Sequence, residues 1–221
     1  MTLDEMVAGR LHEVRRRIAA AGGIGVSVLA VTKTFGAEAC WAAYRAGCTA
    51  VGENYAQEVV AKLGGVEVPF EVRFIGQLQT NKVRALAPIV SVYETVDRAS
   101  LVAELAKRVP GARVLVQVAP DAASSGKGGC ELHGVPALVD VALAAGLDVR
   151  GLMTVGPTEG GPEAARQGFR AVRSLVDRLA LSECSMGMTA DLEVAVQEGA
   201  TQVRVGSALF GARPPFTTQV R

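Results

Sequence analysis

The hydrophobic positions of the chain open with a helical pattern. Between Leu3 and Ile18, apolar residues recur every three or four positions, which is the spacing of a helix with one buried face. Thr2 and Glu5 form a T-x-x-E capping box at the start of this pattern, and a Gly-Gly pair follows its last apolar position. The sequence therefore predicts a helix ahead of the first strand.

Beyond this helix, short β-branched runs alternate with helical patterns. Strands are predicted at 26–32, 49–53, 71–75, 90–96, 113–118, 149–154, 183–186 and 202–206. Helices are predicted between them at 37–46, 55–63, 79–87, 98–108, 133–145, 163–180 and 189–198. This alternation indicates an α/β fold with a parallel sheet and right-handed crossovers. Eight such strands favour a single (β/α)8 TIM barrel with an extra N-terminal helix. An open doubly wound sheet is the alternative, because strand number alone does not establish closure.

Composition narrows the class of protein. The 221 residues suit one barrel domain, and 23 basic against 22 acidic residues give no argument for a nucleic acid or membrane partner. The longest uncharged run, 18–32, contains three glycines and is too short to cross a bilayer. The N-terminal positions that are basic in a secretory signal peptide are occupied by acidic residues in this sequence. Four scattered cysteines and two histidines suggest neither a disulfide framework nor a histidine-rich metal site. We therefore expect a cytoplasmic protein that binds no metal.

Lys33 is the most informative single residue. It closes the apolar run of the first predicted strand, so in a barrel it lies at the carboxyl edge, where active sites form. Burial lowers the pKa of a lysine, and a neutral amine is a nucleophile that forms a Schiff base with an aldehyde. The alternative is a structural lysine whose stem covers apolar surface while its ammonium group reaches solvent.

The ends of the last two predicted strands form a second candidate site. Gly206 and Ser207 follow the eighth strand, and Gly187 follows the seventh. Glycine lets backbone N–H groups approach a ligand, and the loops after strands seven and eight are the recurrent phosphate site of such barrels. The alternative is that both glycines form ordinary strand-to-helix turns. The glycine-rich loop 121–129 lacks the pattern of a P-loop.

Two polar residues stand at strand positions with two possible roles each. Arg204 lies between Val203 and Val205. Since successive side chains of a strand point to opposite faces, Arg204 points into the barrel if the two valines face the helices. A buried guanidinium needs a partner, which is either a structural ion pair or the ring nitrogen of a bound pyridine cofactor. Asn54 ends the second strand, where it either reaches a ligand or caps the next helix.

Eight short segments follow one another along the chain in an order typical of one family. They are AVTK (30–33), GENYAQE (52–58), FIGQLQTNK (74–82), TVDR (95–98), VQV (116–118), GLM (151–153), SMGM (185–188) and RVGSALFG (204–211). Each is weak alone, but together they are specific. The chain resembles the pyridoxal phosphate homeostasis protein family.

The resemblance implies a barrel like the N-terminal domain of alanine racemase over residues 1–221, with pyridoxal 5′-phosphate (PLP) as the cofactor. It implies a Schiff base on Lys33. The other implied cofactor-binding residues are Asn54, Met153, Ser185, Met186, Arg204, Gly206 and Ser207. In the family, the positions of Ser185, Gly206 and Ser207 hold the phosphate with Met186 nearby, and the position of Arg204 faces the pyridine nitrogen.

The sequence departs from the family pattern at three positions. Arg73 stands where the family usually has histidine, the Ser-Lys-Ser-Gly loop reads Gly-Lys-Gly-Gly at 126–129, and Ser207 replaces a threonine of the phosphate site. The third change keeps the hydroxyl group. The first two leave the roles of Arg73 and of the loop open, and none of the three touches Lys33.

The resemblance favours a non-catalytic protein that acts in intracellular PLP homeostasis by buffering or delivering the cofactor. Apo forms of PLP-dependent enzymes would be its partners, and we expect a monomer. Racemases of related architecture need a second acid–base group from another domain, for which 221 residues leave no room. The alternative is an amino-acid racemase or transaminase of unknown substrate, with Tyr55 or Lys82 as the base. A third hypothesis is a regulatory module that senses PLP.

Overall fold

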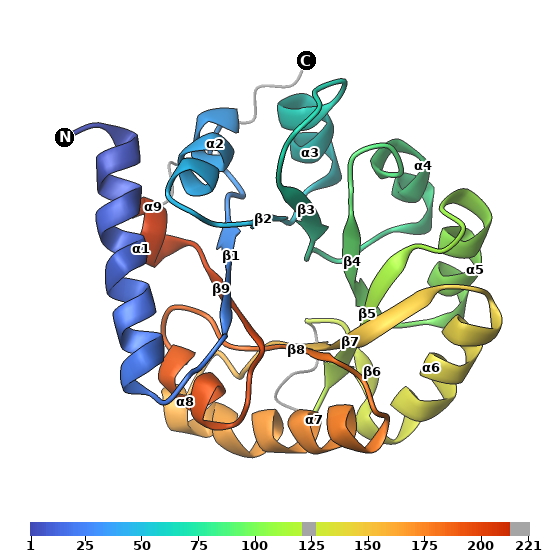
Figure 1. The fold of residues 1–221 in the computed structure, drawn as a ribbon. Helices are drawn as coiled ribbons and strands as arrows, with labels where there is room; N and C mark the ends of the chain where they lie inside the picture. Colours follow the sequence, from blue (N-terminus) through green and yellow to red (C-terminus); the bar gives the residue numbers. More distant parts are fainter. Residues whose placement is uncertain (121–126, 213–221) are drawn as a thin grey trace.

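The computed structural model, which describes residues 1–120 and 127–212, is an eight-stranded parallel barrel surrounded by helices (Figure 1). The barrel strands are β1 (Ser27–Val31), β2 (Ala50–Glu53), β3 (Glu71–Phe74), β4 (Val92–Val96), β5 (Arg113–Ala119), β7 (Asp148–Thr154), β8 (Glu183–Ser185) and β9 (Gln202–Val205). Neighbouring strands pair in parallel around the ring, β1 pairs with β9, and β4 pairs with β5. The predicted TIM barrel is therefore confirmed, and the open sheet is excluded.

The helices form the outer layer of the barrel. They are α1 (Leu3–Ala20), α2 (Ala37–Arg45), α3 (Ala56–Leu63), α4 (Val83–Leu86), α5 (Ala99–Arg108), α6 (Val135–Ala144), α7 (Arg166–Arg178), α8 (Leu192–Gln197) and α9 (Ser207–Phe210). The extra helix α1 packs against α2, α8 and α9. Its predicted capping box is present, because the Thr2 hydroxyl accepts from the Glu5 N–H and the Glu5 carboxylate accepts from the Thr2 N–H.

The structure differs from the sequence-based prediction in its 3-10 turns, in one short strand and in one short helix. Helix α4 is shortened by a preceding 3-10 turn, η1 (Thr80–Lys82), and similar turns, η3 (Leu132–Gly134) and η4 (Pro162–Ala165), precede α6 and α7. A two-residue strand, β6 (Cys130–Glu131), adds to the edge of β5. Neither β6 nor α9 was predicted, because such short elements contain no full hydrophobic period. Of the loop 121–129, residues 121–126 lie outside the described residues.

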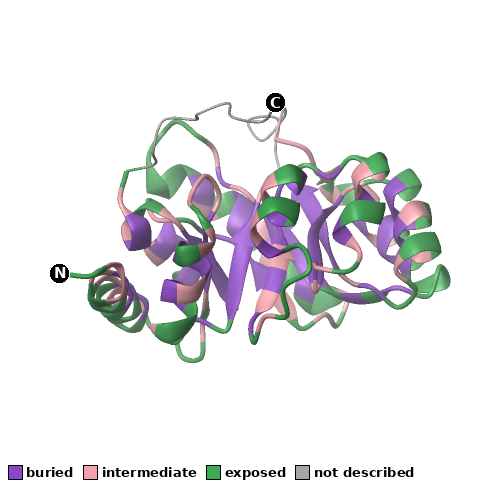
Figure 2. Cartoon of the chain, turned by 90° about the horizontal axis from the view of Figure 1, so that it is seen from above, coloured by how far each residue is buried: buried purple, intermediate pink, exposed green. Residues whose placement is uncertain are grey.

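The residues of the barrel strands are mostly buried, as the purple colour of the strands in Figure 2 shows. The main cluster fills the space between strands and helices, where Leu11 of α1 and Phe169 of α7 are buried. Leu29, Leu115 and Met153 are also buried but lie outside this cluster. Since side chains alternate across a strand, these residues face the barrel interior. In the part of the chain that the structure describes, no helix is long and apolar enough to cross a membrane.

A network of ion pairs crosses the barrel interior and includes Arg73. The Arg73 guanidinium lies 2.7 Å from a carboxylate oxygen of Glu183, 3.0 Å from Glu71 and 3.2 Å from Glu94. Burial opposes the charge of this arginine, but the attraction of Glu94 and the hydrogen bond to Glu183 hold the pKa of Arg73 above its usual value. The residue that departs from the family pattern therefore links three carboxylates below the carboxyl end of the barrel.

Candidate functional site

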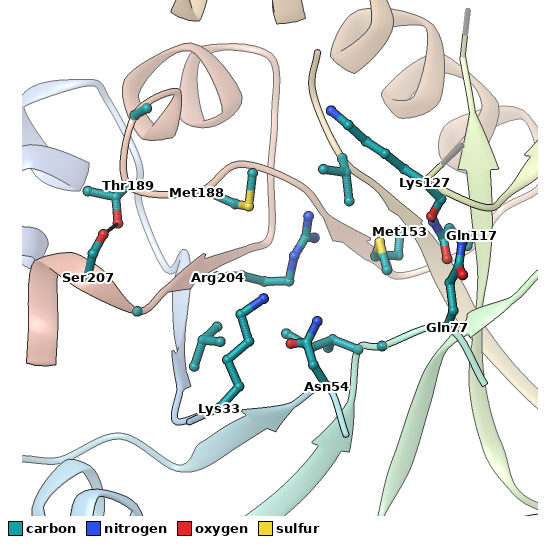
Figure 3. A pocket seen from close by; sticks show the side chains of 16 residues that line it. Lys33, Asn54, Gln77, Gln117, Lys127, Met153, Met188, Thr189, Arg204 and Ser207 are labelled. Atoms are coloured by element: carbon teal, nitrogen blue, oxygen red, sulfur yellow. Dashed lines mark hydrogen bonds between the residues drawn. The ribbon is translucent and has the colours of Figure 1, made fainter. Parts of the chain in front are cut away.

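A cavity of about 410 Å³ opens at the carboxyl ends of the barrel strands (Figure 3). Its walls come from segments far apart in the sequence, because all eight parallel strands end at this edge. The polar side chains around it are Lys33, Asn54, Gln77, Gln117, Lys127, Thr189, Arg204 and Ser207, and the apolar walls include Met153 and Met188. The cavity is therefore rich in nitrogen and hydroxyl donors.

Lys33 enters this cavity from the end of β1. Strand β1 stops at Val31, so the chain turns just before Lys33. The side chain is half-buried, and Figure 3 shows its amine pointing into the cavity between Arg204 and Asn54. The sequence-based expectation of a lysine at the barrel mouth agrees with this placement.

Asn54 follows β2 and lines the same cavity. Its Oδ1 atom is buried and has no hydrogen-bond partner among the described residues. Tyr55 rather than Asn54 is the cap residue of α3, so the alternative of a capping role for Asn54 is not what the structure shows. A buried acceptor without a partner costs free energy of about 1–3 kcal/mol, which a ligand with a hydroxyl group would recover.

Arg204 forms the floor of the cavity. It is 4% exposed, and its Nη1 donates to the carbonyl (2.8 Å) and hydroxyl (2.9 Å) of Ser185, while Nη2 donates to the Thr154 carbonyl (2.6 Å). Val203 and Val205 belong to the core between strands and helices, so Arg204 points inward, as predicted. Burial lowers the pKa of Arg204, and the charges of Glu94 and Asp191 oppose this shift.

Ser185 and Met186 do not line the cavity. The Ser185 hydroxyl is fully buried, and it donates to Glu94 Oε2 at 2.7 Å while it accepts from Arg204. It thus connects Arg204 to the ion pairs around Arg73. Met186 is buried in the core between strands and helices. The six other cofactor-binding residues that the resemblance implies all line the cavity, namely Lys33, Asn54, Met153, Arg204, Gly206 and Ser207.

Two hydroxyl groups and a glycine gather on the wall formed by the loops after β8 and β9. Ser207 Oγ lies 3.3 Å from Thr189 Oγ1. A dashed line in Figure 3 marks this hydrogen bond. The turn before Thr189 is fixed by Gly187, whose φ of +89° and whose contact with Ala195 exclude a side chain. A Cβ on Gly206 would lie 3.3 Å from the Val31 carbonyl oxygen. This wall presents hydroxyl and backbone groups to a ligand at close range.

Sequence reasoning missed several lining residues. Gln77, Gln117 and Lys127 form the wall opposite Thr189 and Ser207 (Figure 3). The Gln117 amide donates to the Lys127 carbonyl at 3.0 Å, and Lys127 Nζ donates to the Gly156 carbonyl at 2.6 Å. The sequence could have indicated Gln117, because a polar residue in the middle of the apolar strand β5 is unusual unless it has a role.

Comparison with known proteins defines first the class and then the family. The chain matches the family of the alanine racemase N-terminal domain over residues 7–214. It is therefore an alanine-racemase-type barrel with an amine at the end of β1. It is 37% identical to the pyridoxal phosphate homeostasis protein of Pseudomonas aeruginosa, with 96% of each chain covered, and 36% identical to that of Escherichia coli, with 94% of this chain and 97% of the relative covered. The chain belongs to the pyridoxal phosphate homeostasis protein family.

Solved structures agree with this assignment. PipY of Synechococcus elongatus, solved with PLP bound, superposes with a TM-score of 0.79 at 28% identity, and the match covers 93% of this chain and 100% of PipY. Lysine decarboxylase from Selenomonas ruminantium superposes with a TM-score of 0.71 at 18% identity, which shows a shared fold over 60% of that enzyme. The family resemblance in the sequence is thereby confirmed.

Proposed function

We propose that this protein binds PLP in the cavity, holds it as a Schiff base on Lys33, and buffers or delivers it within the cell. The observation that carries the proposal is the position of the Lys33 amine. It points into a cavity that has a buried guanidinium at its floor and paired hydroxyl groups on one wall. Membership of the family and the PLP-bound relative PipY support the choice of cofactor.

The residues around the cavity fit the chemical groups of PLP. When bound, PLP supplies an aldehyde that condenses with a primary amine with loss of water. Lys33 is a primary amine with its stem among the cavity walls. The unpartnered Oδ1 of Asn54 is an acceptor for a hydroxyl group such as the phenol of PLP. Arg204 has more N–H donors than its three contacts use, which leaves donors for a ring nitrogen.

The phosphate group would lie against Thr189, Gly206 and Ser207. We expect Ser207→Ala to weaken PLP binding about tenfold, because a hydrogen bond to a charged group contributes about 1.5 kcal/mol or more. Pyridoxal, which lacks the phosphate, serves as the ligand control and should bind both forms equally. Ser182→Ala, at the opposite end of β8, serves as the protein control. Equal weakening for PLP and pyridoxal would place the phosphate elsewhere.

A carrier role is favoured over catalysis by the groups facing Lys33. A guanidinium donates and does not accept, so Arg204 would keep the ring nitrogen unprotonated and weaken the cofactor as an electron sink. The two candidate bases, Tyr55 and Lys82, line a separate hollow beside the main cavity. Lys127 lines the main cavity, but its amine is held by the Gly156 carbonyl. These positions support a carrier role over catalysis.

The carrier role is tested by exchange and transfer together. We expect the PLP-loaded protein to exchange the α-protons of amino acids with deuterated water no faster than free PLP does at the same concentration. It should also restore activity to the apo form of a PLP-dependent enzyme. An authentic alanine racemase is the positive control for exchange. Rapid exchange that disappears in Lys33→Met would instead favour the racemase or transaminase alternative.

A further inference from the structure

A buried group of charges lies behind Lys33, outside the cavity. Glu53 at the end of β2, together with Glu58 and Lys62 on α3, forms what we call the Lys62 cluster. Lys62 Nζ lies 2.9 Å from Glu53 Oε1 and 3.0 Å from Glu58 Oε2, and the Glu53 and Lys62 side chains are 0% and 9% exposed. Buried ion pairs contribute little net stability compared with apolar packing, so stability alone does not account for this cluster.

The Lys62 cluster contacts the backbone on both sides of Lys33. On one side, Lys62 Nζ donates to the Thr32 carbonyl at 2.9 Å, and the Thr32 hydroxyl donates to Glu53 Oε1 at 2.6 Å. On the other side, Glu58 Oε2 accepts from the Thr34 N–H at 2.8 Å. A single group of charges therefore holds both residues that flank Lys33 in the sequence.

Thr34 adopts a backbone conformation that needs such support. Its φ is +68°, which is rare for a β-branched residue, and conformations of this kind persist only where the surroundings impose them. The Thr34 hydroxyl is buried and has no hydrogen-bond partner in the part of the chain that the structure describes. The hydrogen bond from the Thr34 N–H to Glu58 supports the residue in this conformation.

The electrostatic balance of the cluster keeps Lys62 charged. Burial alone would lower the pKa of Lys62, but the attraction and hydrogen bonds of Glu53 and Glu58 raise it above its usual value. For Glu53, burial raises the pKa, and Lys62 and Thr32 oppose that shift. Lys62 therefore keeps the proton with which it holds the Thr32 carbonyl at neutral pH.

We propose that Glu58 and Lys62 are positioning residues that fix the turn around Lys33 and so preset the direction of its amine into the cavity. The inference rests on the proposed function, since it concerns the residue that takes the cofactor. A turn that is already ordered in the cofactor-free protein loses little conformational entropy on binding. The cofactor therefore meets an amine in reacting position.

The first test needs no cofactor and measures hydrogen exchange at the Thr34 amide. We expect Glu58→Ala to speed this exchange about tenfold or more, because its hydrogen-bond acceptor is lost. Glu58→Gln keeps an acceptor oxygen and should retain most of the protection. Glu104→Ala is the matched control, because Glu104 and Arg108 on α5 form a pair with the same spacing as Glu58 and Lys62. It should leave Thr34 unchanged.

The second test measures PLP binding through the visible absorbance of the Schiff base. Glu58→Ala and Lys62→Met should each raise the dissociation constant about tenfold, which corresponds to about 1.4 kcal/mol, because a turn that is no longer fixed must be ordered on binding, and ordering the backbone of one residue has a cost of this size. Glu58→Gln should restore most of the affinity, and Glu104→Ala should bind as the wild type does. Glu58 is the more exposed of the two residues, with 21% of its side chain accessible, so the comparison of Ala and Gln at this position carries the test if Lys62→Met does not fold.

The outcomes separate this inference from the proposed function. If the wild type forms a Schiff base on Lys33 but Glu58→Ala matches it in PLP affinity and in Thr34 exchange, the positioning role is overturned and the proposed function stands. If the wild type itself forms no adduct on Lys33, both are overturned, and this result is seen before any variant is compared. Faster exchange and weaker binding in Glu58→Ala, with rescue by glutamine, would support the positioning role.

Discussion

Lys33→Met is expected to abolish the visible absorbance of the Schiff base and to raise the dissociation constant for PLP on the order of 100-fold, which corresponds to about 2.7 kcal/mol. Methionine fills much of the same space but has no amine, so the covalent bond is lost while the cavity walls remain. Absorbance spectra and equilibrium titration of the two purified proteins measure the effect.

Lys127→Met is the matched control for this prediction. Lys127 also lines the cavity, but its amine donates to the Gly156 carbonyl at 2.6 Å. We expect this variant to keep the absorbance of the wild type. If Lys127→Met loses the absorbance while Lys33→Met keeps it, the assignment of the reactive lysine is wrong.

Arg204→Met is expected to lower the free energy of unfolding by about 2–5 kcal/mol, because each buried acceptor left without its donor costs about 1–3 kcal/mol. The change removes the donors that satisfy the Thr154 carbonyl and the Ser185 carbonyl and hydroxyl. Since a whole domain is stabilised by only about 5–15 kcal/mol, the loss should be easily measured by urea unfolding of the cofactor-free protein.

Arg16→Met provides the comparison for Arg204. Arg16 pairs with Glu13 on the exposed face of α1, where its side chain is 69% accessible, and solvent screens such pairs. We expect its replacement to leave the urea midpoint unchanged. Equal midpoints for Arg204→Met and Arg16→Met would mean that Arg204 does not support the barrel interior, and that its burial serves ligand binding alone.

The strands were predictable because each one buries a face against the helices. In β5, for example, Val114, Val116 and Val118 belong to the helix-facing core, and the run 113–118 was recognised from the sequence. Closure of the barrel was favoured but not fixed, because it requires the first strand, β1, to pair with the last, β9, and the same alternation of strands and helices also fits an open sheet. The elements that were missed, β6 and α9, contain two and four residues.

The site was predictable where position along a strand determines placement. Lys33 and Ser207 follow the ends of β1 and β9, and parallel strands bring such ends together. How far each side chain lies below the carboxyl ends of the strands could not be predicted in the same way. Ser185 points inward but lies beside Gln202, below the cavity, and Met186 turns outward to the helices. Likewise, the sequence could not predict that Arg73 meets Glu94 and Glu183, because these carboxylates come from two other strands, β4 and β8.

The most direct test of the central claim is borohydride reduction of the PLP-treated protein, followed by peptide mass mapping. Reduction converts a Schiff base into a stable secondary amine, so the modified lysine can be identified. We predict a pyridoxyl-phosphate adduct on Lys33, and none at that position in Lys33→Met. An adduct on Lys82 or Lys127 instead, or no adduct with excess PLP, would contradict the claim that Lys33 holds the cofactor.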